Sequence, residues 1–319
     1  MKNKNAKSYT NAIGIIVLLL IIAGFIYYIA THLSDFKQLS LVNPIFILYL
    51  AIIVLLFSIA SGLILKYTLV PFGIKMKFKE WFGLSTITTF YNTITPFRGG
   101  MVAKAVYLKK THKFSYTDFL ANYSGIYIIN FLASGLLGMI SMWFLYKESS
   151  QFNLVIFLIF LAFFIPSLGV IIFSPNLKDT KYSIINRVIN LINGWNKLRR
   201  NKLVVFQVII ITIVQLALGA ISSTISYHIF GIELTLSQAF FLVSIGTIAG
   251  AFSITPGSLG IAEAVAVFSA LAIGITPAQS LTVAILGRAV STIIIFILGP
   301  IFSYFLLKNS KENNSKNEK

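Results

Sequence analysis

Two short interruptions of apolar sequence, 160 residues apart, constrain this chain more than any other feature. Residues 93–100 and 253–260 share the pattern [Ser/Thr]-Ile-Thr-Pro-x-x-x-Gly, with four identities and one Ser/Thr exchange in eight positions. Proline removes a backbone donor and ends a helix, and glycine tolerates the irregular backbone that follows. In a membrane, such backbone is stable only where it is buried in protein or lines a watery cavity. Paired interruptions in two halves of a chain therefore predict the central site of a transporter.

The composition indicates the environment of the chain. Hydrophobic residues make up 57% and charged residues 11% of the 319 positions, and the mean hydropathy is +0.85. A soluble domain carries about 25% charged residues, so we expect an all-α polytopic membrane protein. The net charge of +17 is carried by short loops between apolar runs, which indicates membrane topology and not nucleic-acid binding. Because the chain has no cysteine, disulfides and thiolate chemistry are excluded.

Six apolar runs have the roughly 20 residues that a transmembrane helix needs. They occupy residues 12–30, 44–65, 117–146, 152–173, 203–229 and 277–307. The first run follows three lysines, as in a signal peptide, but it is long and has no convincing cleavage site, so we expect an uncleaved anchor. Within 184–198, apolar residues recur at helical spacing beside basic residues, which predicts an amphipathic helix on the inner leaflet.

Two further apolar segments, 81–108 and 238–273, are divided by the interruptions. Their arms are short, so we expect two oppositely oriented re-entrant helical hairpins; the alternative is eight helices in which the hairpins span. Residues 44–146 then form repeat one, and residues 203–307 form repeat two, of an inverted-topology pair within a single transmembrane domain, 1–307. Exchanging the conformations of two such halves opens opposite faces of the membrane in turn.

The basic residues predict the orientation of the chain. Of the 26, only Lys37 and Lys147 fall in outer loops and Arg288 within the membrane, and the others lie on one side of this arrangement. Cytoplasmic loops carry the excess of lysine and arginine, so we expect a multi-pass cell-membrane protein with both termini in the cytoplasm. The basic, asparagine-rich tail, 308–319, is expected to be disordered.

The first break supplies candidate residues for binding an anion. Arg98 has a planar, always-charged guanidinium, and the backbone N–H groups at Gly99 and Gly100 begin the next half-helix, so together they are suited to a lipid phosphate. The alternative is an arginine that snorkels to the interface or caps carbonyls. Lys104, one turn later, either adds to the phosphate site or snorkels. The residues assigned to the breaks themselves are Pro96, Gly99, Gly100, Pro256, Gly257 and Gly260.

Two more ionisable residues lie in repeat two, where a charge near the membrane centre costs about 2.5–3.5 kcal/mol even on insertion scales. Glu263 either receives a cationic headgroup or a proton, or complements the dipole of its own half-helix, or pairs with Arg288. For Arg288 we favour the structural partner over the direct ligand. Five uncharged residues are candidates to line a polar path or to make interhelical hydrogen bonds: Asn92, Asn122, Tyr123, Tyr127 and Asn130.

The sequence gives no sign of a catalytic or metal site. It has no Gly-x-x-x-x-Gly-Lys-[Ser/Thr] loop for ATP, its three histidines lack metal-ligand spacing, and its loop aspartates lie far apart. We therefore expect no cofactor, no metal and no catalytic residue, and any energy source is an ion gradient, the membrane potential or downhill equilibration.

At the two breaks the sequence resembles the lysylphosphatidylglycerol synthase transmembrane region family of flippase-like membrane proteins. The family's first motif, Pro-x-Arg-x-Gly-[Glu]-x-x-[Arg]-x-x-x-Leu, is matched by Pro96, Arg98, Gly100 and Leu108, with Lys104 in place of the second arginine and Met101 in place of the glutamate. Its second motif, Pro-x-x-Leu-Gly-x-x-Glu, is matched by Pro256, Leu259, Gly260 and Glu263, and Arg288 matches an arginine of the last helix. The resemblance covers about residues 41–307.

The resemblance implies a function in membrane lipid handling. The best understood relatives, the multiple peptide resistance factors, couple such a membrane region to a cytosolic domain that transfers lysine from charged tRNA to phosphatidylglycerol. Nothing in this sequence resembles that domain, so we expect no transfer activity. The leading hypothesis is a translocase that moves the headgroup of a phospholipid or an aminoacylated lipid between leaflets. The alternatives are a transferase that acts on aminoacylated or polyprenyl-phosphate lipids, a subunit of such a transferase, or a scaffold for a separate synthase.

Overall fold

The computed structural model describes residues 41–150, 152–173, 176–178 and 180–317, and all regular structure in these ranges is helical. The anchor expected at 12–30 lies outside the described residues. Three short 3-10 helices are η1 (Val70–Phe72), η2 (Pro96–Arg98) and η3 (Pro256–Ser258). The α-helices are α3 (Phe46–Leu69), α4 (Phe78–Ile94), α5 (Gly99–His112), α6 (Tyr116–Ser149), α7 (Leu154–Phe173), α8 (Ser183–Leu198), α9 (Lys202–His228), α10 (Leu236–Gly250), α11 (Ile261–Leu271) and α12 (Pro277–Asn317).

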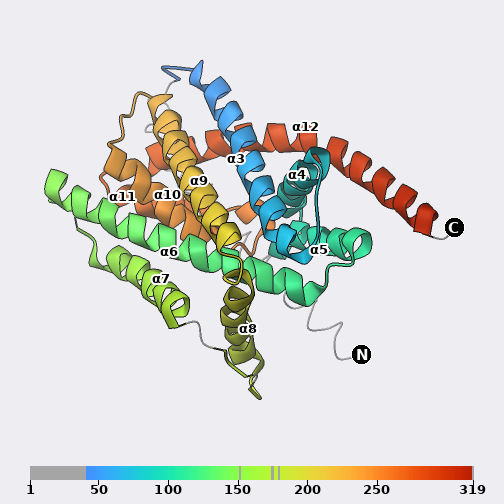
Figure 1. Cartoon of the computed structure of the whole chain (residues 1–319). Helices are drawn as coiled ribbons and strands as arrows, with labels where there is room; N and C mark the ends of the chain where they lie inside the picture. Colours follow the sequence, from blue (N-terminus) through green and yellow to red (C-terminus); the bar gives the residue numbers. More distant parts are fainter. Residues whose placement is uncertain (1–40, 151, 174–175, 179, 318–319) are drawn as a thin grey trace, which may run out of the picture.

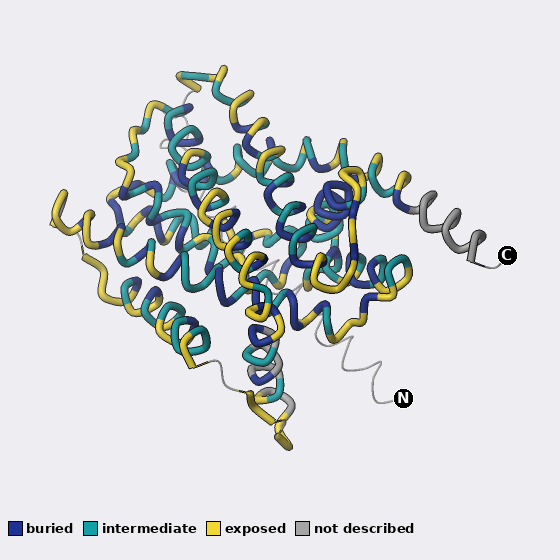
Figure 2. Tube along the Cα trace, viewed as in Figure 1, coloured by how far each residue is buried: buried dark blue, intermediate teal, exposed yellow. Residues whose placement is uncertain are grey.

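Five of these helical stretches are long and apolar enough to cross a membrane, namely Phe46–Phe72, Tyr116–Glu148, Leu154–Phe173, Lys202–His228 and Pro277–Leu306. They confirm five of the six runs that the sequence predicts. Their outward side chains are apolar: Leu48 of α3 is 62% exposed and Phe206 of α9 is 61% exposed. Figure 2 shows such exposed positions alternating with buried ones along both helices. Apolar surface of this kind suits lipid and not water, so the chain is a multi-pass membrane protein.

The other helices that flank the two breaks are shorter. α4 has 17 residues, α5 has 14, α10 has 15 and α11 has 11. At about 1.5 Å per residue, none reaches across the roughly 30 Å of hydrocarbon in a bilayer. α4 with α5, and α10 with α11, therefore form two helical hairpins whose arms are too short to cross a bilayer, which is consistent with the re-entrant arrangement that the sequence predicts.

The two halves of the fold are oriented in opposite directions. The start of α3 lies at the end of α9, where the N–H of Val42 donates to the carbonyl of Ile229 at 2.8 Å. The other end of α3 meets the start of α9, because Ile64 packs in one core cluster with Val204 and Val208. Antiparallel α3 and α9 send the chain into the two hairpins from opposite ends of the molecule. In Figure 1, α10 and α11 lie toward one end and α4 and α5 toward the other.

The long helices α6 and α12 run across the molecule on either side of the hairpins (Figure 1). α6 begins where the side chain of Ser115 accepts a hydrogen bond from the N–H of Asp118 at 3.0 Å, a standard N-terminal cap. α10 packs against α6, and α4 packs against α12. Each hairpin is thus held on one side by a long helix, which fixes the position of its break.

α8 packs against α6 at its C-terminal end, where Trp195 is 4% exposed and Leu198 is 5% exposed and Lys197 pairs with Asp118 at 2.8 Å, whereas Ile185 of the same apolar stripe is 45% exposed. The position of α8 on the inner leaflet stays a prediction. Helical periodicity indicates an apolar face but not what covers it. α12 continues to Asn317, into the tail for which the sequence predicts disorder, and no glycine or proline interrupts the chain after Pro300.

Candidate functional site

The two helix breaks meet inside the fold. The backbone N–H of Phe97 in η2 donates to the carbonyl of Ile254, just before η3, at 3.0 Å. A Cβ added to Gly257 would lie 3.4 Å from the Cα of Thr93, so the second break packs directly on the backbone of the first hairpin. The two segments that the sequence relates by a 160-residue offset are therefore neighbours in space.

The breaks also share one backbone conformation. In each, an extended threonine precedes the proline that begins a 3-10 turn. Phe97 (φ 53°) and Arg98 (φ 55°) correspond by the same offset to Gly257 (φ 56°) and Ser258 (φ 57°). A left-handed conformation costs a residue with a side chain on the order of 1–3 kcal/mol and is characteristic of functional sites. Three of these four positions carry that cost, so both breaks are strained in the same way.

The glycines are required for different structural reasons in the two breaks. Gly260 has a left-handed φ of 79°, which a side chain would strain. Gly99 is right-handed, with a φ of −57°. A Cβ on Gly100 would collide with the carbonyl oxygen of Thr88 and lie 2.8 Å from Oδ1 of Asn92. In the first hairpin, glycine thus permits close packing of α5 on α4, while Phe97 and Arg98 supply the irregular backbone.

Arg98 links the first break to the second hairpin. Its Nη1 donates to the hydroxyl of Tyr127 on α6, and its Nη2 donates to the carbonyl of Gly250. Gly250 is the last residue of α10, so the guanidinium lies where the helix dipole concentrates negative charge. The carbonyl-capping alternative that the sequence left open for Arg98 is therefore present in this conformation.

Glu263 and Arg288 form an ion pair between α11 and α12. Nε of Arg288 donates to Oε1 of Glu263, and its Nη1 donates to the carbonyl of Gly257 at 2.9 Å. The second carboxylate oxygen of Glu263 accepts the backbone N–H of Gly260 at 2.7 Å. The glutamate, 6% exposed, thus holds the start of its own half-helix and the arginine at once, and the arginine holds the turn of the second break.

A cavity of about 510 Å³ lies beside the junction of the two breaks. We call it the arginine cavity, since Arg98, Glu263 and Arg288 all line it. Around these ions the lining is mostly hydroxyl and amide groups from both hairpins and α12: Thr89, Asn92, Thr93, Ser253, Ser258, Ser291 and Thr292, with Gly257, Ala262, Ala284 and Ile295. Two guanidinium groups and one carboxylate leave one positive charge unbalanced, which favours an anionic ligand.

Lys104 is not one of the described residues that line the arginine cavity. Its side chain is 5% exposed, and its Nζ donates to the hydroxyl of Tyr123 at 2.7 Å on the α6 side of α5. Of the uncharged candidates, Asn92 lines the arginine cavity and its Oδ1 has no partner among the described residues. Asn130 accepts a hydrogen bond from Thr212 at 3.1 Å, which is the interhelical role.

Sequence reasoning missed the hydroxyl groups around the ions. Ser291 and Thr292 follow Arg288 by three and four residues, and Thr89 and Thr93 flank Asn92 by three and one. Residues three and four apart share one face of a helix, so the polar face of each helix was present in the sequence as spacing. It went unrecognised because serine and threonine are common in membrane helices as interhelical contacts.

The comparisons with known proteins agree with this architecture. Residues 12–299 match the sequence model of the family described as the lysylphosphatidylglycerol synthase TM region. The chain belongs to this family. No curated protein and no solved structure matches it. The matched region of the lysylphosphatidylglycerol synthase TM family includes both helix breaks and every charged residue of the arginine cavity, and membership gives the chain a function related to membrane lipids.

Proposed function

We propose that this protein is a lipid translocase that moves a phospholipid or aminoacylated lipid headgroup between leaflets while the acyl chains stay in the bilayer. The observation that carries the proposal is the arginine cavity, a polar space with surplus positive charge where two opposed helix breaks meet. Irregular backbone and buried charge are both costly in lipid, and both are typical of substrate paths.

The charged residues of the cavity suit the phosphate that phospholipid headgroups share. Arginine binds phosphate through parallel N–H donors, and such charge-assisted bonds are about twice as strong as neutral ones. Arg98 and Arg288 line one cavity from opposite halves of the fold. Of the N–H groups of Arg288, those on Nε and Nη1 have recorded partners, which leaves its other Nη as a donor for the phosphate. Lys104 donates to Tyr123 instead, so we assign the phosphate to the two arginines.

The same contacts supply a route to alternating access. Arg98 of the first break holds the end of α10 in the second hairpin, and Arg288 holds the carbonyl of Gly257. A phosphate that takes over the donors of Arg98 releases the carbonyl of Gly250 and loosens the first hairpin from the second. Because the two halves are inverted copies, the rearrangement that opens one face has a counterpart that opens the opposite face.

Reconstitution in liposomes with headgroup-labelled lipids tests the proposal. Wild-type protein is expected to equilibrate labelled phospholipid between leaflets, and Arg98→Ala is expected to slow this at least about tenfold, since hydrogen bonds to charged groups contribute about 1.5–3 kcal/mol. Glu263→Gln is expected to slow it as well, because Arg288 loses its counter-ion. The matched control is Arg199→Ala, an exposed arginine after α8 that does not line the cavity.

Two results would contradict the proposal. The first is translocation by Arg98→Ala at the wild-type rate, which would place the path elsewhere. The second is formation of aminoacylated lipid from charged tRNA by the purified protein alone, which would favour the transferase alternative.

A further inference from the structure

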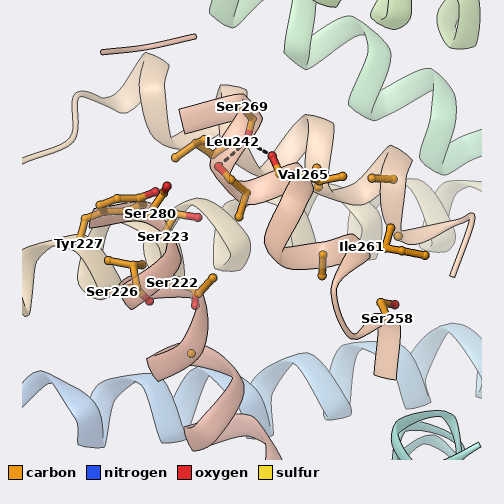
Figure 3. Close-up of a pocket in the computed structure, with 18 residues that line it drawn as sticks. Ser222, Ser223, Ser226, Tyr227, Leu242, Ser258, Ile261, Val265, Ser269 and Ser280 are labelled. Carbon is orange, nitrogen blue, oxygen red and sulfur yellow. Dashed lines mark hydrogen bonds between the residues drawn. The ribbon is translucent and has the colours of Figure 1, made fainter. Parts of the chain in front are cut away.

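A second cavity, of about 280 Å³, lies next to the arginine cavity between α9, α10, α11 and α12 (Figure 3). The two cavities share three lining residues, Ser258, Ala262 and Ala284. We call the second one the serine cavity. Its lining has five more serines, and Figure 3 shows Ser222, Ser223 and Ser226 grouped on one side of it. Since a water molecule occupies about 30 Å³, the cavity has room for a group much larger than a single water.

The hydroxyl groups of these three serines are available to a ligand. Serine in a membrane helix usually donates to the carbonyl four residues earlier, and Ser269 and Ser280 of the same cavity do so at 2.7 and 3.1 Å. Ser222, Ser223 and Ser226 have no recorded hydrogen bond to any described residue. Ser226 is only 7% exposed as a residue, yet it lines the serine cavity, so a ligand in the cavity can reach its hydroxyl. A ligand with several hydroxyl groups would satisfy all three.

The charge of the lining limits which ligand fits. Of the described residues that line the two cavities, Glu263 is the only acidic one. Both of its carboxylate oxygens are in use, one by Arg288 and one by the N–H of Gly260. An ammonium group in the serine cavity would find no free carboxylate there and would lie near two arginines. A neutral group would meet no such repulsion.

We infer that the serine cavity binds a neutral polyhydroxyl group, a glycerol or a sugar, attached to the phosphate that the arginine cavity holds. This inference rests on the proposed function, and it narrows the substrate to an anionic phosphodiester lipid with a neutral, hydroxylated headgroup. Lipids whose headgroups carry an ammonium group, including aminoacylated ones, bind less well. The shared lining residue Ser258 lies between the two subsites, at the second helix break.

Two glycines of the serine cavity allow it to be filled without disturbing the fold. A Cβ added to Gly246 or Gly287 would meet no atom within 4 Å. Gly246 lines the serine cavity and is not among the residues that line the arginine cavity. Gly246→Leu therefore occupies the first and leaves the second intact. Gly169 of α7 has equally open surroundings and lines neither cavity, so Gly169→Leu is the matched control.

Binding of short-chain lipids to the purified full-length protein in detergent, measured by native mass spectrometry, tests the inference. The probes are dihexanoyl phosphatidylglycerol, phosphatidylinositol, phosphatidylethanolamine and lysyl-phosphatidylglycerol. Wild type is expected to bind phosphatidylglycerol and phosphatidylinositol more tightly than the other two lipids. Comparison of these two lipids shows whether the cavity prefers a glycerol or a sugar-like headgroup. A Ser222→Ala, Ser223→Ala, Ser226→Ala triple variant is expected to bind phosphatidylglycerol and phosphatidylinositol about tenfold more weakly and to leave phosphatidylethanolamine binding unchanged, since the hydrogen bonds to the headgroup hydroxyls are lost.

The control variants make each outcome decisive. Ser269→Ala with Ser280→Ala removes hydroxyls that are already satisfied and is expected to leave binding unchanged, as is Gly169→Leu, whereas Gly246→Leu is expected to match the triple variant. Equal binding of all four lipids, or a triple variant indistinguishable from wild type, overturns the inference even if liposome translocation is observed. Selective, serine-dependent binding with no translocation supports the inference and overturns the proposed function instead.

Discussion

Glu263 and Arg288 stabilise the second break through three hydrogen bonds. The carboxylate joins the guanidinium to the N–H of Gly260, and the guanidinium joins the carboxylate to the carbonyl of Gly257. A buried ion pair gains little over an apolar pair of the same size, but removal of one partner is costly because the other charge stays buried. We therefore explain the pair by its location and not by a net gain in stability. It places charged groups at the second break and holds the backbone of the turn.

This arrangement predicts strong coupling between the two residues. Glu263→Leu and Arg288→Leu are each expected to destabilise the protein by about 3 kcal/mol, because each leaves an unpaired charge. The double variant is expected to lose clearly less than the sum of the two. Thermal unfolding in detergent measures all three. The exposed pair of Lys197 with Asp118 (48% and 32% exposed) is the control, since Lys197→Met is expected to cost under about 1 kcal/mol. Additive losses at Glu263 and Arg288 would contradict this account.

The residues of the site could be predicted from the sequence to different degrees. Arg98, Glu263 and Arg288 were recognisable because charge is rare in apolar segments, and the structure brings all three to one cavity. Lys104 is also a charged residue in an apolar segment, but its position on α5 directs its side chain toward α6, where it donates to Tyr123. Ser222, Ser223 and Ser226 of the serine cavity have the three- and four-residue spacing of one helix face, but they carry no charge, so the sequence does not distinguish them from interhelical contacts.

At the scale of elements, the first hairpin depends on how closely its two arms approach. The start of α5 crosses α4 at Gly100, where a side chain would overlap the carbonyl of Thr88. Main-chain atoms cannot move aside as a flexible side chain can, so Gly100→Ala must separate the arms. We expect a loss of about 2 kcal/mol in stability, as for other overpacked sites. Gly169→Ala, where an added Cβ meets nothing within 4 Å, is expected to be neutral or slightly stabilising.

Thermal unfolding of the two alanine variants measures this difference, and translocation assays add a second result. Separation of α4 from α5 displaces Asn92 and Thr93, which line the arginine cavity, so Gly100→Ala is expected to slow translocation as well. Unfolding of Gly100→Ala at the wild-type temperature would contradict this account, because it would mean that α4 and α5 leave space for a side chain at position 100.

The elements show where sequence reasoning holds and where it ends. Length and hydropathy located the spans, and proline located the breaks, because both effects act within a single segment. α8 illustrates the limit. Its periodicity predicts one apolar face, but membrane and protein both cover such faces, and here α6 covers Trp195 and Leu198 while Ile185 is exposed. The left-handed residues of the first break show the same limit, since glycine was the expected residue and Phe97 and Arg98 take the conformation.

At the scale of the whole molecule, both halves of the chain contribute to one cavity. Neither break alone encloses a cavity: the arginine cavity takes its lining from α4 and η2 of the first repeat and from η3, α11 and α12 of the second. The sequence predicted this from an eight-residue pattern, the 160-residue offset and the placement of basic residues. It did not predict the hydrogen bond between the breaks, which depends on how α6 and α12 hold the hairpins.

Inversion also predicts which loops face which side of the membrane. The α3–α4 loop and the α9–α10 loop occupy equivalent places in the two repeats, and the antiparallel packing of α3 on α9 puts them at opposite ends of that helix pair.

Cysteine labelling tests this placement. Since the chain has no cysteine, single cysteines at exposed Lys75 and Glu233 report on these loops separately. We expect a membrane-impermeant maleimide added to intact cells to label Glu233→Cys and not Lys75→Cys, because the lysines around position 75 favour the cytoplasm. Both sites are expected to react once the membrane is permeabilised. Labelling of both from one side of intact cells would place the two loops on the same face, and two repeats with the same orientation could not exchange access in the way that we propose.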